Sequence, residues 1–184
     1  MVSFKLPPKF LEMYNSKSLE RFSLGGEENQ KNLISWLKSP SGNLLFHGKM
    51  GRQKTFCAAQ CVMDLIKTSK IQEHEFLFCN LADLYQFWLA GFIEKTSNLE
   101  LLNRLKAAKL LVLDDLGVRE PTDAFLKYLY CLINYRCDNH LLSTIYTTNL
   151  SSEEINKQLG SRIVSRISDG VIIEMKGKDK RKES

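Results

Sequence analysis

The sequence lacks any long apolar run. No stretch approaches the roughly 20 apolar residues of a membrane-spanning helix, and the N-terminus has no continuous apolar segment of the kind found in secretion signals. Internal repeats are absent, and the one compositionally biased tract is a short basic stretch at the C-terminus. We therefore expect a cytoplasmic protein that makes no membrane contact.

The sequence lacks any Cys-x-x-Cys pair that would suggest a zinc site. Five cysteines, an odd number, favour a reducing cytosol over a disulfide framework. Those that fall within expected helices or strands should be small buried hydrophobic side chains. The five are Cys57, Cys61, Cys79, Cys131 and Cys137.

The composition favours a single domain with a substantial core. The chain has 184 residues, of which 43% are hydrophobic, and a formal net charge of +5. Strand patterns alternate with helix patterns, which predicts a parallel sheet with helices on both faces. The expected strands are 43–47, 75–79, 110–115, 141–149 and 171–175. The expected helices are 27–38, 54–67, 81–92, 99–106, 122–138 and two short ones within 151–168, after an extended lead-in over 1–26.

Two of these helices have clear apolar faces. In the helix 27–38 we expect Leu33, Ile34 and Leu37 to form the buried stripe, with Trp36 beside it. In the helix 122–138 the inward residues should share one face at helical spacing. They are Phe125, Leu129, Leu132 and Ile133.

Residues 48–55 read Gly-Lys-Met-Gly-Arg-Gln-Lys-Thr, a phosphate-binding loop that lacks one glycine. Gly48, Gly51, Lys54 and Thr55 fall in register with the pattern, whereas Gln53 stands where the last glycine belongs. Glycine is favoured where the backbone φ turns positive or where a Cβ would press on a phosphate. The alternative is an ordinary glycine-bearing turn between a strand and a helix.

If the loop binds a nucleotide, its backbone amides and the helix N-terminus would surround the phosphates. Lys54 would reach the β- and γ-phosphates, and the Thr55 hydroxyl would bind Mg²⁺. About sixty residues downstream, a buried strand pattern ends in Asp114 and Asp115. There Asp114 would complete the Mg²⁺ site and Asp115 would polarise the attacking water. The alternative is an Asp-Asp turn after a core strand.

A third polar group follows the β-branched stretch 141–149. Asn149 ends this stretch, and its neutral amide would orient the hydrolytic water against the γ-phosphate. Alternatively, Asn149 would only cap the next helix. Ser151 is the better cap, because Glu154 follows three residues later and completes a capping box.

With these motifs in place, the chain resembles the AAA+ domain of the DnaC/DnaI helicase loaders and the related IstB-like ATPases. Four segments in family order carry the resemblance, which extends from residue 6 to the C-terminal tail. They are Asp114-Asp115-Leu116-Gly117 (Walker B), Thr147-Thr148-Asn149-Leu150 (sensor 1), the arginine-finger segment 159–167, and 177–181, which is weakly similar to the family's closing Gly-x-Ser-Tyr-Arg.

The resemblance implies a P-loop AAA+ three-layer sandwich with a five-stranded parallel sheet, using ATP and Mg²⁺. It divides the chain into the lead-in 1–26, an AAA+ ATPase domain 27–175 and a basic tail 176–184. It also implies a homo-oligomer formed on ATP binding, in which Arg166 enters the neighbour's site and Arg162 supports it. Arg181 aligns with the sensor 2 arginine that contacts the nucleotide. For Arg162 and Arg166, the alternative is a solvated helix face.

The resemblance further implies a role in DNA replication, with single-stranded DNA and a hexameric replicative helicase or a transposase as partners. The basic tail is suited to contacts with phosphates, although such a run can also be a solvated end. Aromatic residues after the second strand would either stack on bases or pack in the core. They are Tyr85, Phe87, Trp88 and Phe92. Because of Gln53, a pseudo-ATPase adaptor remains the alternative to an active ATPase.

Overall fold

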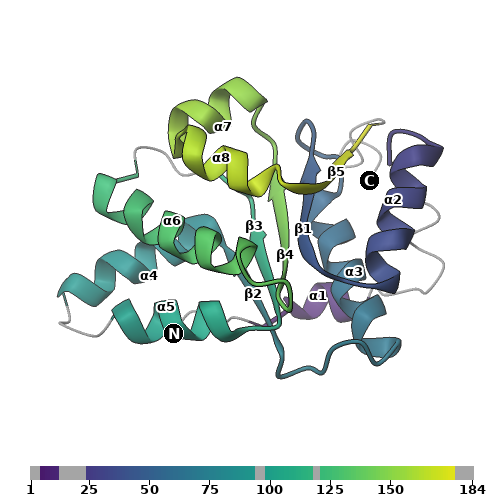
Figure 1. Ribbon diagram of the computed structural model, residues 1–184, viewed down its shortest axis with the longest axis horizontal. Helices are drawn as coiled ribbons and strands as arrows, with labels where there is room; N and C mark the ends of the chain where they lie inside the picture. The colour runs from purple at the N-terminus through teal and green to yellow at the C-terminus, as the bar shows by residue number, and fades with distance from the viewer. Residues whose placement is uncertain (1–4, 13–23, 94–97, 118–120, 177–184) are drawn as a thin grey trace.

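The computed structural model describes residues 5–12, 24–93, 98–117 and 121–176. Its centre is a sheet of five parallel strands in the order β2-β3-β4-β1-β5 (Figure 1). The strands are β1 (Gly42–His47), β2 (Phe76–Asn80), β3 (Leu110–Asp114), β4 (Ser143–Thr148) and β5 (Gly170–Glu174). The predicted parallel sheet is therefore confirmed, with strand ends that differ by only one or two residues.

Helices cover both faces of this sheet and produce three layers (Figure 1). One face is covered by α1 (Pro8–Glu12), α2 (Glu27–Lys38) and α3 (Lys54–Lys67). The helices α4 to α8 pack on the other face. Their bounds are α4 (Leu81–Ile93), α5 (Asn98–Ala107), α6 (Asp123–Cys137), α7 (Ser152–Leu159) and α8 (Ser161–Ile167).

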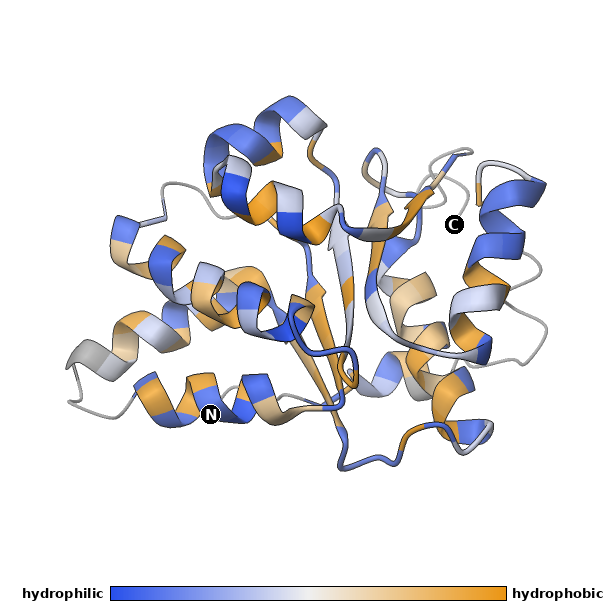
Figure 2. Cartoon of the chain, viewed as in Figure 1, coloured by the Kyte–Doolittle hydropathy of each residue, from blue (hydrophilic) through white to orange (hydrophobic). Residues whose placement is uncertain are grey.

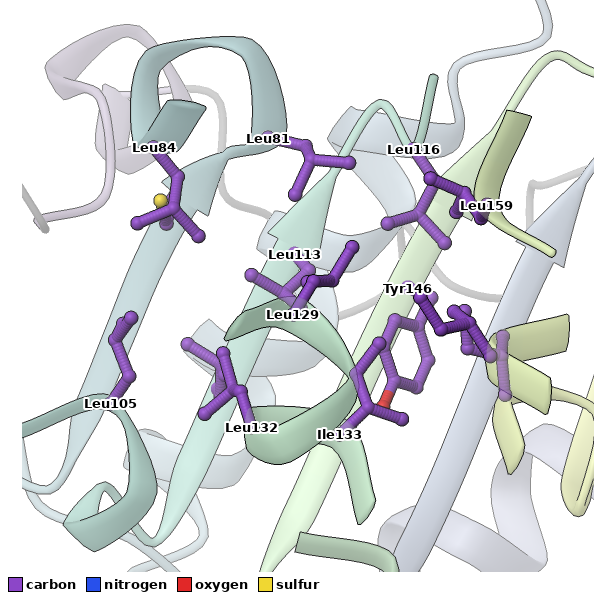
Figure 3. Packing of buried hydrophobic residues seen from close by; sticks show 14 of the residues in the cluster. Leu81, Leu84, Leu105, Leu113, Leu116, Leu129, Leu132, Ile133, Tyr146 and Leu159 are labelled. Atoms are coloured by element: carbon purple, nitrogen blue, oxygen red, sulfur yellow. The ribbon is translucent and has the colours of Figure 1, made fainter. Parts of the chain in front are cut away.

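The strands read as continuous apolar runs because side chains alternate between two buried faces. Leu44 and Val112 point to the α1–α3 side, whereas Leu45 and Leu113 point to the α4–α8 side. Figure 2 shows hydrophobic residues concentrated in the strands, with β4 paler because it carries hydroxyl side chains. On the α4–α8 side, leucines from the helices and strands gather around Tyr146 (Figure 3).

The expected apolar face of α6 is confirmed, and that of α2 is corrected. All four residues predicted to point inward from α6 are fully buried. In α2, however, Leu33, Trp36 and Leu37 are buried, whereas Ile34 is 44% exposed. The spacing i, i+3, i+4 places Trp36 on the inner face. Its indole also donates a hydrogen bond to the Ser41 carbonyl at 3.0 Å.

The prediction of an extended lead-in is wrong for residues 8–12, which form α1. Pro8 is tolerated there because it is the first residue of the helix, where its missing N–H is not needed. The helix is held by Phe10, whose ring lies 6.0 Å from the ring of Phe56 and 6.5 Å from that of Phe78, measured between centroids. Burial of this ring explains why a segment with two prolines becomes helical.

The expected burial of cysteine and aromatic side chains is confirmed for most of these residues but not for all. Cys57, Cys61 and Cys79 are buried as expected, but Cys131 is exposed, because it lies on the outer face of α6. Trp88 is also buried, and its ring packs against that of Phe125 at 5.5 Å. Tyr85 and Phe87 are partly buried against the same core, so these three aromatic residues pack the domain. The side chain of Phe92 lies outside the described residues.

A buried arginine, Arg136, links the strands β3 and β4 at their amino ends. Its guanidinium is 1% exposed and donates to the Leu105, Ala108 and Ser143 carbonyls at 3.0, 2.7 and 2.6 Å. Burial lowers the pKa of this group to about 10. Because hydrogen bonds to carbonyls stabilise the charge, the cation is tolerated without a carboxylate at these contacts.

Candidate functional site

The loop between β1 and α3 has the backbone conformation that its glycines permit. Gly48 has a φ of 140° and Gly51 a φ of 76°, both disfavoured for residues with a Cβ. A Cβ at Gly48 would also lie 2.6 Å from the Met175 carbonyl oxygen, which is too close. Gly48 therefore allows the start of the loop to pass beside the end of β5.

Gln53 takes the left-handed conformation expected of a glycine. Its φ is 57° and its ψ 26°, and it immediately precedes α3. For a residue with a Cβ, this conformation costs about 1–2 kcal/mol. The residue is exposed, and its side chain makes no hydrogen bond to the helix N-terminus. Gln53 therefore strains the loop backbone without capping the amides of the first turn of α3.

Lys54 is buried at the start of α3, and its ammonium group faces the loop. It donates hydrogen bonds to the Gly48 and Lys49 carbonyls at 2.7 and 3.0 Å. The positive charge and the N-terminus of a 14-residue helix therefore lie at the same place. Both favour an anion, since the helix dipole is positive at this end.

Asp114 lies at the carboxyl end of β3, only 6% exposed. Burial raises the pKa of its carboxyl group, whereas hydrogen bonds from Thr147 and Thr55 and the charge of Lys54 lower it. The Thr147 hydroxyl donates to Asp114 Oδ1 at 2.6 Å. The structure thus brings Lys54, Thr55 and Asp114 together, as the sequence predicts. A carboxylate beside a hydroxyl is a suitable ligand set for Mg²⁺.

Asp115 follows in a left-handed conformation, with a φ of 56° and an exposed side chain. Its backbone N–H donates to the Thr147 hydroxyl at 2.8 Å. The next residue also bonds to β4, because the Leu116 N–H donates to the Thr147 carbonyl at 2.7 Å. These bonds fix the turn after β3 to the end of β4. A strained residue held in this way is typical of functional sites.

Asn149 immediately follows β4 at the same edge of the sheet and is half-buried. Parallel strands bring their carboxyl ends to one edge, so Asn149 lies at the same edge as Asp114 and the loop after β1. The capping role considered for Asn149 is filled by another residue. Ser151 caps α7, accepting from the Glu154 N–H at 3.2 Å while its own N–H donates to the Glu154 carboxylate at 2.7 Å.

Arg166 lies at the opposite edge of the sheet, near the start of β1. The Asn43 amide donates to the Arg166 carbonyl at 2.6 Å, and the Arg166 guanidinium forms an ion pair with Asp138 at 3.3 Å. Arg162 is exposed one turn earlier on α8. The structure does not bring Arg166 to the phosphate loop of its own chain.

Two predicted features lie outside the described residues: the candidate sensor 2 residue Arg181 and the basic tail beyond Lys176. Among the residues that are described, no group of three or more His, Cys, Asp or Glu side chains is placed to bind a metal ion by itself. Within the same residues, no helix has both the length and the apolar character needed to cross a bilayer.

The sequence reasoning missed Thr147 and Asn43. Thr147 is 1% exposed and bonds to both aspartates, although the sequence indicates it only as part of the sensor 1 segment. Asn43 is 3% exposed within β1. The available signal is the same in both: a polar residue at a buried position of a parallel strand, where apolar residues are the rule.

Comparison with known proteins gives relatives in DNA replication and in a phage-like element. No protein-family model matches the chain. The replicative helicase loader DnaC of Escherichia coli K12 is 31% identical over 154 residues, covering 78% of this chain and 60% of DnaC. The phage-like element PBSX protein XkdC of Bacillus subtilis 168 is 30% identical over 138 residues, covering 68% of this chain and 48% of XkdC. The chain therefore spans about half to three fifths of these relatives.

Solved structures share the fold. Crystal structures of the DnaC helicase loader and of DnaI each give a TM-score of 0.74 at 22% identity. These likenesses cover 92% and 96% of this chain and 100% and 94% of theirs. AMPPCP-bound DnaA from Aquifex aeolicus gives 0.72 at 19% identity, covering 92% of this chain and 53% of DnaA. The expected P-loop AAA+ three-layer sandwich is confirmed, and the chain belongs to the DnaC/DnaI-like AAA+ family.

Proposed function

We propose that this protein is a replication-associated AAA+ ATPase that binds Mg²⁺ and ATP at the edge formed by the loop after β1 and the ends of β3 and β4. One observation carries the proposal: Asp114 is a buried carboxylate held by the Thr147 hydroxyl, with Thr55 and Lys54 close enough to change its pKa. A buried acid that also faces a helix N-terminus is suited to a cation that accompanies a phosphate.

The residues present fit such a ligand. The backbone around Gly48 and Gly51 and the uncapped first turn of α3 would hold the phosphates, with Lys54 beside them. Thr55 and Asp114 would bind Mg²⁺, which when bound neutralises charge on the phosphate oxygens. Asp115, exposed next to Asp114, would accept a hydrogen bond from the attacking water, and Asn149 would orient that water.

Arg166 would act on the site of a neighbouring chain. It lies at the edge opposite its own phosphate loop, on a helix whose outer side is exposed at Arg162. An arginine supplied by a neighbour neutralises charge that develops on the γ-phosphate during hydrolysis. The proposal therefore includes a homo-oligomer that forms when ATP is bound.

Steady-state ATP hydrolysis at increasing protein concentration tests this proposal. Turnover per chain should rise with concentration, and Arg166→Ala should reduce it by about 10³-fold or more while ATP affinity changes little. Arg104→Ala, which removes an exposed arginine from α5, is the matched control and should hydrolyse ATP like the parent. A rate that is independent of concentration and survives Arg166→Ala would contradict the proposal.

A second candidate function is a pseudo-ATPase adaptor, and the conformation of Gln53 favours it. A left-handed residue with a side chain is strained in the loop that has to close on the phosphates. This adaptor would keep the fold and its contact surfaces without turnover. ATP binding without hydrolysis at any protein concentration would favour it over the ATPase.

We also propose partners for this protein. Similarity to DnaC favours a hexameric replicative helicase as the protein partner, with a transposase as the alternative. Single-stranded DNA would bind to the basic tail 176–184, where five cationic residues lie within nine positions. Such binding would occur in the cytoplasm and through phosphates more than through bases.

A further inference from the structure

Asn43 is a polar residue in a buried strand, and the hydrogen bonds of its side chain explain why it is tolerated there. It is 3% exposed, at the second position of β1. An amide buried without partners would be costly. The Asn43 amide instead donates to the Arg166 carbonyl at 2.6 Å, the Asp169 carbonyl at 3.2 Å and Cys137 Sγ at 3.3 Å. The acceptors belong to the last turn of α8, the turn from α8 to β5 and the end of α6, respectively.

The turn that follows Arg166 also approaches Asn43 through its backbone. Gly170 pairs with Asn43 in the register between β1 and β5. A Cβ at Gly170 would lie 2.4 Å from the Asn43 carbonyl oxygen, so only glycine permits this approach. The C-terminal end of α8 is thus attached to the first residues of β1 by side-chain bonds and by close packing, and Figure 1 shows α8 leading directly into β5.

The same strand leads to the phosphate loop. β1 runs from Gly42 to His47, and the loop begins at Gly48. Asn43 and Gly48 are therefore separated by roughly 16 Å of extended chain. One rigid strand connects the loop of a chain to the base of the arginine that this chain offers to its neighbour. The Arg166 side chain itself is only loosely held, since its ion pair with Asp138 is solvent-exposed at both ends.

We infer that Asn43 is a positioning residue for Arg166: it fixes the end of α8 to the strand of the phosphate loop and so sets the orientation in which Arg166 reaches the neighbouring site. The inference rests on the proposed role of Arg166 in a second chain. Removal of the amide should misplace the guanidinium without touching the nucleotide site. A catalytic group displaced by about 1 Å can lose up to about 10²-fold in rate.

Mixed oligomers of two full-length variants test this role. Asp115→Asn removes the carboxylate proposed to accept a hydrogen bond from the attacking water, but it keeps Arg166. Asparagine tolerates the left-handed conformation found at this position. Arg166→Ala keeps the site but offers no arginine. Each variant alone should be inactive. Their mixture should hydrolyse ATP only where Arg166 of the first variant enters the site of the second.

Asn43→Ala is then added to one variant at a time. In the Asp115→Asn chain, which supplies the arginine, it should lower the turnover of the mixture roughly tenfold. In the Arg166→Ala chain, which supplies the site, it should leave turnover within about twofold and ATP affinity unchanged. If Asn43→Ala does not fold, Asn43→Ser replaces it, because its hydroxyl ends one bond short of the amide nitrogen.

The outcomes are distinct. Equal losses in the two mixtures, or no loss when the substitution is in the arginine-supplying chain, would overturn the role of Asn43 while leaving the trans role of Arg166 intact. An inactive reference mixture, without any change at Asn43, would overturn the trans role of Arg166 and with it the inference.

Discussion

The Thr147 hydroxyl donates a hydrogen bond of 2.6 Å to Asp114 Oδ1 and accepts one of 2.8 Å from the Asp115 backbone. A single buried side chain on β4 therefore holds both the acid that ends β3 and the acid that follows it. The bond to Asp114 favours the ionised carboxylate, and it opposes the effect of burial, which raises the pKa of that group. Under the proposed function, Thr147 would therefore keep Asp114 available as a Mg²⁺ ligand.

Replacement of Thr147 by valine should remove one hydrogen-bond partner from each of Asp114 and Asp115. Thr147→Val keeps the volume but leaves the Asp114 carboxylate and the Asp115 N–H without this partner, at a cost of about 1–3 kcal/mol in the free energy of unfolding. Thr147→Ser keeps the hydroxyl and is the control. We expect Mg²⁺-dependent ATP affinity to fall for valine and to be largely retained for serine, as measured by titration calorimetry.

The strain at Gln53 predicts that Gln53→Gly will increase the affinity of the loop for ATP. Glycine removes the left-handed penalty, so we expect ATP to bind about tenfold more tightly, equivalent to about 1.4 kcal/mol. Ser69→Gly is the matched control, because Ser69 has the same φ of 57° after the end of α3, away from the phosphate loop. Both variants should change thermal stability similarly, but only Gln53→Gly should change affinity. Equal affinity in parent and Gln53→Gly would remove the main support for a pseudo-ATPase.

Ionisation of Asp114 should lower the free energy of unfolding of the ligand-free protein at neutral pH. Its folded pKa lies above the unfolded value, mainly because of burial. Its contribution to stability is therefore complete below the unfolded pKa and is lost as the pH rises through the folded pKa. Asp114→Asn avoids this loss and keeps an acceptor for Thr147. Denaturant unfolding should show the variant gaining stability over the parent as the pH rises from acid to neutral, while its Mg²⁺-dependent ATP binding is lost.

No such gain at neutral pH would mean that the Asp114 carboxylate is better stabilised than its burial indicates. Asp83→Asn provides a control for the removal of an acid, because Asp83 lies in the first turn of α4, outside the site. There, loss of the favourable interaction with the helix dipole should lower stability slightly.

The apolar runs and the P-loop motif were enough to predict the parallel sheet and the edge at which the acids gather. A strand buried on both faces leaves little ambiguity, and its carboxyl end locates the site. In α2 the helical spacing of Leu33, Trp36 and Leu37 already favours Trp36 over Ile34 for the inner face, so the error there came from hydrophobicity alone, which does not separate the two residues. The sequence could not show that residues 8–12 are helical, since the ring of Phe10 stabilises them through contacts with distant Phe56 and Phe78.

Buried polar residues were the largest omission. Asn43 and Thr147 in the strands, and likewise Arg136 in α6, occupy buried positions because of partners that are distant in sequence. Local patterns identify such residues as exceptions but do not name their partners. Only the packing of α6 and α8 on the sheet shows that Asn43 bonds to the end of the arginine-bearing helix.

Binding to single-stranded DNA should depend on charge. A triple substitution of Lys178, Lys180 and Lys182 by glutamate keeps Arg181 and reverses the charge of the tail. If each lysine contacts one phosphate, the slope of log affinity against log salt should fall by up to about 2, at roughly 0.7 per contact. The control makes the same lysine-to-glutamate change at Lys31, Lys67 and Lys157, which are exposed on α2, α3 and α7. Parent-like binding by the tail variant at all salt concentrations would show that the tail is only a solvated end.

The most direct test of the account is the affinity for ATP and ADP, measured with and without Mg²⁺ for the parent, Lys54→Ala and Asp114→Asn. We predict that the parent binds ATP and that Mg²⁺ strengthens this binding. Lys54→Ala should weaken binding under both conditions, since it removes the charge beside the loop, whereas Asp114→Asn should remove only the effect of Mg²⁺. Absence of ATP binding by the parent, or binding that neither substitution changes, would contradict the assignment of a nucleotide site to this edge of the sheet.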